Sequence, residues 1–117
     1  MINSQAQLGV IYDSGFATPI NDLGEFKRLI DRAEKTNRDF KLGVKYIVTE
    51  NADYTVRHSN WYNVAYYEND SRQLTIWSFD VSNLKDGLTA AGITFEDFKE
   101  LIELSSINLR IKGEESL

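Results

Sequence analysis

The segment 61–79, WYNVAYYENDSRQLTIWSF, constrains the fold more than any other part of the chain. Two runs with aromatic residues at alternate positions flank the polar turn Asn69-Asp70-Ser71, which is the pattern of a β-hairpin. A three-residue turn would place Glu68 opposite Arg72, and a set of aliphatic and tyrosine side chains would then face the core: Tyr62, Val64, Tyr66, Leu74 and Ile76. A slip of one residue would reverse the faces of the second strand. We prefer the first register because it pairs aliphatic with aliphatic and acid with base.

In this register the other side of the hairpin carries four large aromatic side chains: Trp61, Tyr67, Trp77 and Phe79. They are mixed with Asn63, Gln73 and Thr75, which suits a binding face with a polar rim. The sequence therefore predicts an interface for a protein partner or for self-association. The alternative is that a terminal helix or the 13–19 loop covers these rings, because large aromatic residues are usually buried.

Hydrophobic periodicity predicts the remaining elements. Apolar side chains alternate in residues 7–12, 41–49, 54–58 and 106–112, as in strands. A helix should begin at Asn21 or Asp22 and end near Thr36-Asn37, because apolar side chains recur there at helical spacing: Leu23, Phe26, Leu29, Ile30 and Ala33. Two further helices are expected within residues 80–104. Asp80 or Ser82 could cap the first, Gly87 weakens it by about 1 kcal/mol, and Gly92 should end it. Thr94 should cap the second.

These elements predict an α+β fold, with a curved antiparallel sheet of four to five strands and two to three helices packed on one face. The last strand could pair with the first. The 117 residues suit one domain, so we expect a single domain over residues 1–112 and a frayed tail over 113–117.

Composition narrows the chemistry. The chain has no cysteine, which excludes disulfides, thiolate catalysis and cysteine-bound zinc. No apolar run approaches the roughly 20 residues that span a bilayer, and the first ten residues lack the features of a signal peptide. We therefore expect a cytoplasmic protein that does not act at a membrane.

The net charge of -5 is concentrated in residues 80–117. Glu96, Asp97, Glu100 and Glu103 recur at helical spacing and form an acidic stripe on the last helix. Such a stripe is usually a solvated surface. It could also imitate a phosphate backbone, which would make the protein an inhibitor of phage or mobile-element type that occupies the basic groove of a nucleic-acid-binding protein.

The basic residues of the first helix, Lys27, Arg28, Arg32 and Lys35, are interleaved with acids. This mixture argues against direct nucleic-acid binding, because the basic stripe of such proteins is absent. Bases could stack on Trp61, Trp77 or Phe79, but the sequence shows no basic residues that would guide a strand there.

No residues make a convincing catalytic or metal site. His58 is the only histidine, and strand alternation places it and Arg57 on opposite faces. No phosphate-binding glycine motif occurs. We therefore expect a regulatory or protein-binding domain that is not an enzyme and has no metal or cofactor. It would act through the aromatic face and the acidic helix. A further alternative is a small-molecule pocket lined by tyrosines: Tyr46, Tyr54, Tyr62 and Tyr66.

Overall fold

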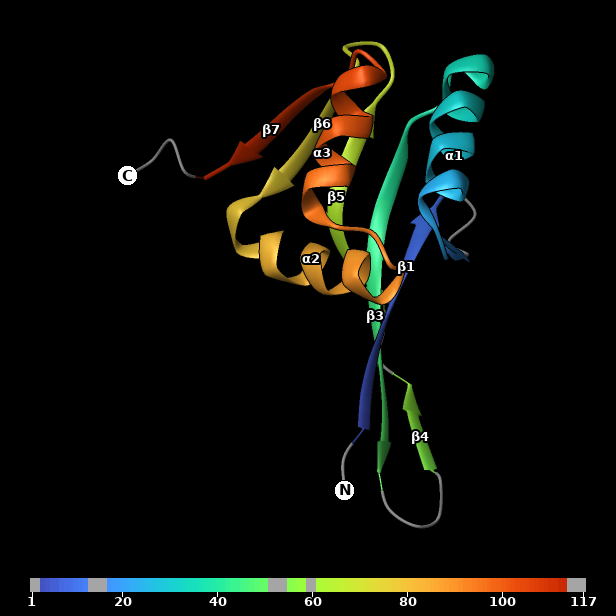
Figure 1. Cartoon of the computed structure of the whole chain (residues 1–117), viewed down its shortest axis with the longest axis vertical. Helices are drawn as coiled ribbons and strands as arrows, with labels where there is room; N and C mark the ends of the chain where they lie inside the picture. Colours follow the sequence, from blue (N-terminus) through green and yellow to red (C-terminus); the bar gives the residue numbers. More distant parts are fainter. Residues whose placement is uncertain (1–2, 13–16, 51–54, 59–60, 114–117) are drawn as a thin grey trace.

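The computed structural model describes the backbone of residues 3–12, 17–50, 55–58 and 61–113, and the side chains of 6–12, 17–46 and 61–113. Within these residues the chain forms seven strands and three α-helices (Figure 1). The strands are β1 (Asn3–Ile11), β2 (Ala17–Pro19), β3 (Phe40–Glu50), β4 (Thr55–His58), β5 (Tyr62–Glu68), β6 (Gln73–Trp77) and β7 (Asn108–Lys112). The helices are α1 (Leu23–Thr36), α2 (Val81–Ala90) and α3 (Phe95–Leu104), and the 3₁₀ turn η1 (Ser78–Asp80) precedes α2. The predicted α+β class is confirmed.

The strands form one mixed sheet in the order β2-β1-β3-β5-β6-β7, and β4 pairs with β3 outside this sequence. The prediction of four to five antiparallel strands was wrong in two respects. Residues 17–19 of the expected loop form β2, and β7 lies parallel to β6 instead of beside β1. The reason is the connection: α2 and α3 carry the chain back across the sheet, so that β7 runs in the direction of β6.

β1 and β3 continue past the helices as a two-stranded extension (Figure 1). β4 pairs with this part of β3, with Ile47 opposite His58 and Glu50 opposite Thr55. The predicted tail 113–117 lies outside the described residues except for Gly113.

The three helices of the described residues pack on the same face of the sheet. α2 lies across β1, β3 and β5, whereas α3 lies in front of β5 and β6 in Figure 1 and contacts β7, the strand that follows it. α1 joins this layer through an edge-to-face contact between Phe26 and Phe98 of α3, with ring centres 5.4 Å apart. The core fills the space between this layer and the sheet, and no helix of the described residues lies on the opposite face (Figure 1).

Local signals set the helix ends. The Asp22 carboxylate accepts a hydrogen bond from the Glu25 amide at 2.7 Å, and the Thr94 hydroxyl accepts one from the Asp97 amide at 3.0 Å. The predicted caps of α1 and α3 are therefore confirmed. Gly92, with φ +73°, follows the end of α2 in the left-handed region that favours glycine. Asp80 precedes α2 but makes no side-chain capping bond, and burial raises the pKa of its carboxyl.

The predicted register of the hairpin was wrong by one residue. The structure pairs Glu68 with Gln73 and Tyr67 with Leu74, so the turn has four residues and includes Arg72. Arg72 takes a left-handed backbone with φ +50°, and its guanidinium donates hydrogen bonds to the carbonyls of Ser105 and Ser106 beyond α3. These contacts hold Arg72 in the turn, away from the expected cross-strand pair with Glu68.

The change of register exchanges the positions of Tyr66 and Tyr67 relative to the core. Tyr67 points into the core, where its ring lies 4.8 Å from that of Phe40 and its hydroxyl donates to Asn69. Tyr66, predicted to face the core, is on the other side. Val64 stays buried because it is the extra residue of a bulge between β3 and β5.

Candidate binding site on the outer face of the sheet

We call the side of the sheet that faces away from the helices the outer face. Strand alternation and the register assign to it the described side chains of Lys41, Lys45, Trp61, Asn63, Tyr66, Glu68, Gln73, Thr75, Trp77, Asn108, Arg110 and Lys112. These described side chains include four cations and one acid, Glu68, and a second acid, Asp39, accepts a hydrogen bond from the Tyr66 hydroxyl at 3.0 Å; the whole chain carries a net charge of -5. The outer face is therefore locally positive.

The register aligns part of the outer face into a row across four strands. Lys41 lies opposite Tyr66, Tyr66 opposite Thr75, and Thr75 beside Arg110. Neighbouring strands are about 4.8 Å apart, so Tyr66 stands between a lysine on one side and an arginine two strands away on the other. The row places one exposed ring and two cations on a common surface.

Trp77 and Lys112 form the next pair on β6 and β7. The Lys112 ammonium lies 4.7 Å from the centre of the Trp77 ring, within the range of a cation–π contact. Phe79 stacks beside Trp77 with ring centres 6.3 Å apart. Trp77 is 41% exposed and Phe79 is 76% exposed, so this aromatic pair is accessible to a partner.

A shallow groove of about 370 Å³ lies beside Trp77 and Tyr66. Its lining consists of outer-face residues from β5, β6 and β7: Tyr66, Glu68, Gln73, Thr75, Trp77, Arg110 and Lys112. The groove combines aromatic surface with hydrogen-bonding groups of both kinds, which can hold a ligand without any covalent chemistry.

Trp61 is half-buried and packs against the sheet. It lies across Gly9 and Gly43, which face each other on β1 and β3. A β-carbon at Gly9 would be 2.7 Å from Cη2 of Trp61, so the glycine leaves the space that the indole occupies. The Lys45 ammonium lies 5.9 Å from the ring centre. Trp61 thus extends the aromatic and cationic surface toward β1.

Two predicted tyrosine sets are corrected by the structure. Tyr67 is fully buried and cannot belong to an exposed aromatic face; Tyr66 takes its place. The proposed tyrosine pocket is not assembled as predicted, because Tyr46 and Tyr62 lie on the helix side of the sheet, whereas Tyr66 lies on the outer face. Tyr54 lies outside the described residues.

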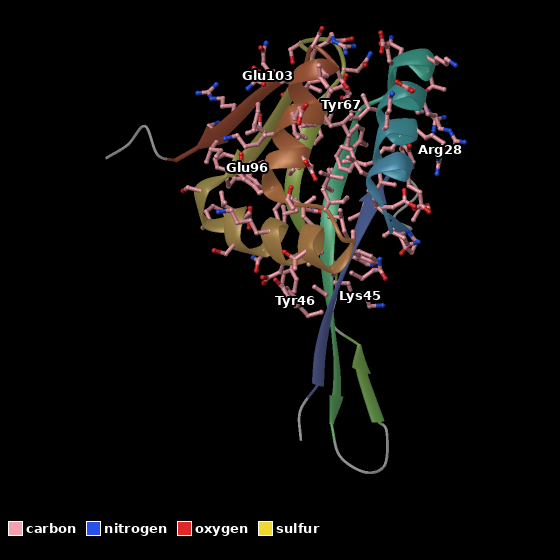
Figure 2. All side chains as sticks on the ribbon, viewed as in Figure 1. Arg28, Lys45, Tyr46, Tyr67, Glu96 and Glu103 are labelled. Atoms are coloured by element: carbon pink, nitrogen blue, oxygen red, sulfur yellow. The ribbon has the colours of Figure 1, made fainter. Side chains whose placement is uncertain are left out.

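The acidic stripe lies in the helix layer, away from the outer face. Glu96, Asp97, Glu100 and Glu103 are all exposed on α3, and Figure 2 shows Glu96 and Glu103 toward its two ends. No metal-binding group of three or more acidic, histidine or cysteine side chains occurs among the described residues. The aromatic face and the acidic stripe are therefore separate surfaces of opposite charge, on opposite sides of the sheet.

Tyr46 has the most strongly perturbed hydroxyl among the described residues, but it lies on the helix side (Figure 2). Its oxygen is 2.9 Å from both Asn83 Oδ1 and Asp86 Oδ2 on α2. Burial, followed by the hydrogen bond to Asp86, raises the pKa of Tyr46 to about 12. This contact holds α2 against β3. With this pKa, the Tyr46 hydroxyl is not suited to act as an acid or base near neutral pH. The side chain of His58 falls outside the described set.

The sequence interpretation placed Tyr66 in the core or in a tyrosine pocket, and it did not assign Lys41, Arg110 or Lys112 to a binding site. The signal for the last two was present: in residues 108–112, NLRIK, polar and apolar side chains alternate, so Asn108, Arg110 and Lys112 share one face. The pattern does not show that this strand pairs with β6, and this pairing is what places Arg110 and Lys112 beside the aromatic residues.

No helix in the described part of the chain is long and apolar enough to cross a membrane. Comparison of the whole chain with protein-family models, with curated proteins and with solved structures found no match.

Proposed function

We propose that the chain is a non-enzymatic binding domain that holds its partner on the outer face of the sheet. The observation that carries this proposal is the accessible pair Trp77 and Phe79, next to Lys112, on a face that no described helix covers. Tryptophan, tyrosine and arginine supply most of the binding energy at known interfaces. The groove beside Trp77 contains all three residue types.

The charge of the outer face indicates the charge that a partner should carry at its contact surface. Four cations, Lys41, Lys45, Arg110 and Lys112, outnumber the two described acids at this face, Glu68 and the Asp39 bound to Tyr66. A partner with negative charge at its contact surface is therefore favoured, both in affinity and in the rate of encounter. The chain as a whole is acidic, so this attraction is local and sensitive to salt.

The acidic stripe of α3 is not part of this surface. One flat contact on the outer face cannot also reach the exposed side of a helix that packs on the other side of the sheet. The rings and the acids therefore do not act together in this contact, and a role for the acidic stripe stays a separate prediction.

The proposal is tested by capture with two matched variants. Phe79 and Leu104 are each 76% exposed, the first beside Trp77 and the second at the end of α3. Serine at either position should change stability by only about 0.5 kcal/mol. We expect the wild type and Leu104→Ser to retain the same molecules from a cell lysate, and Phe79→Ser to lose them. Equal retention by all three proteins would contradict the proposal.

A further inference from the structure

Cations lie close to aromatic side chains on the outer face. The sequence alone shows no basic residues near the rings and therefore argues against base stacking. The register supplies them, because β7 brings Arg110 beside Thr75 and Lys112 beside Trp77, and β3 brings Lys41 beside Tyr66. Proteins that bind single strands combine such cations with aromatic side chains on which bases stack.

The groups between the rings are suited to base edges. Gln73 and Thr75 line the groove and are partly exposed. An amide and a hydroxyl can each donate and accept hydrogen bonds, and unstacked bases present both kinds of group. Phe79, which is the most exposed of these rings, extends the stacking surface past the end of β6.

From these positions we infer that the partner of the outer face is a single-stranded nucleic acid, an inference that rests on the proposed function. Bases would stack on Tyr66, Trp77 and Phe79, and phosphates would lie near the lysine and arginine side chains. Lys41, Arg110 and Lys112 are exposed and stand on both sides of the rings. A backbone that crosses the sheet from β3 to β7 would meet a cation at each end.

Two features favour a single strand over the alternatives. Lysine is depleted in protein–protein interfaces, whereas three of the four described cations here are lysines. A duplex keeps its bases stacked inside, so the exposed rings would have nothing to stack on. A protein partner, including a second copy of the chain, is therefore the competing outcome of the test.

The test is fluorescence anisotropy of a labelled oligothymidylate and a labelled oligouridylate with the full chain. Both probes share phosphates and π-faces, and their difference in affinity would distinguish DNA from RNA. We expect Trp77→Ala to weaken binding about tenfold, since one stacked base is lost. Lys112→Gln and Arg110→Gln change only exposed side chains, so these variants should fold. They test the outer face even if Trp77→Ala fails to fold. With three phosphate contacts, the logarithm of the binding constant should fall with the logarithm of salt concentration with a slope of about -2.

The helix side offers a matched control. Lys85 and Lys99 flank Phe95 there, with ammonium groups 4.9 and 5.8 Å from the ring centre. Lys85→Gln and Lys99→Gln remove the same charge beside the same kind of ring, and we expect them to change affinity less than twofold.

Absence of binding at low salt, or equal losses in the control variants, would overturn the inference. If neither probe binds while Phe79→Ser still abolishes capture, the nucleic-acid inference fails and the proposed function stands. If that variant also fails to change capture, both fail. A light-scattering mass of a dimer that falls to a monomer in Phe79→Ser would likewise overturn the inference and assign the face to a second copy.

Discussion

At the scale of single residues, Tyr46 links the sheet to α2 through one hydroxyl group, 2.9 Å from two acceptors. We predict that Tyr46→Phe lowers the free energy of unfolding by about 1 kcal/mol near pH 8, the usual contribution of one hydrogen bond. The folded-state pKa of about 12 lies above the ordinary value of 10.0. The hydroxyl therefore contributes fully below pH 10, and its contribution is lost as pH rises through 12.

Urea unfolding of both proteins between neutral and high pH checks this prediction. The difference between the wild type and Tyr46→Phe should narrow over that interval. A difference between the wild type and Tyr46→Phe that stays constant to the highest pH would contradict the assignment.

At the scale of elements, the close approach of α2 to the sheet depends on Gly87. A β-carbon there would lie 2.8 Å from Cγ2 of Val44 and 3.2 Å from Cδ1 of Leu8, both buried. Alanine would improve helix propensity by about 1 kcal/mol, but overpacking a core costs about 1–3 kcal/mol. We predict that Gly87→Ala is destabilising overall, despite the expectation that glycine weakens this helix.

Gly24 of α1 provides the matched control in thermal unfolding. Its β-carbon would meet only the exposed side chains of Asp22 and Arg28, at 3.2 and 3.6 Å. Gly24→Ala should change the free energy of unfolding by about 0.5 kcal/mol at most. If Gly87→Ala melts at or above the wild-type temperature, α2 does not need the close approach.

The same scale explains which parts of the fold could be predicted. The starts of α1 and α3 could be predicted, because Asp22 and Thr94 accept hydrogen bonds from amides only three residues later. The hairpin register could not, because it depends on Arg72 reaching the carbonyl of Ser105, 33 residues later. The same holds for the candidate site. Trp77 and Phe79 could be identified from local alternation. Tyr66 and the cations near it could be assigned to the outer face only with the hairpin register and the pairing of β7 with β6.

At the scale of the whole molecule, the sheet separates two surfaces of opposite charge. The outer face combines exposed rings with lysine and arginine, and the far side of the helix layer carries the acidic stripe from Glu96 to Glu103 (Figure 2). Net charge alone would class the chain as a poor ligand for polyanions. The distribution of charge predicts that a polyanion meets one face and avoids the other.

The most direct measurement of this claim is a two-dimensional NMR titration of the isotopically labelled chain with oligothymidylate. The chain has two tryptophans, so the indole N–H region reports separately on Trp61 and Trp77. We predict that the Trp77 indole signal and the amide signals of β6 and β7 move on titration, whereas those of α3 stay in place. An unchanged Trp77 indole signal, or shifts that gather on α3, would contradict the assignment of the outer face as the binding surface.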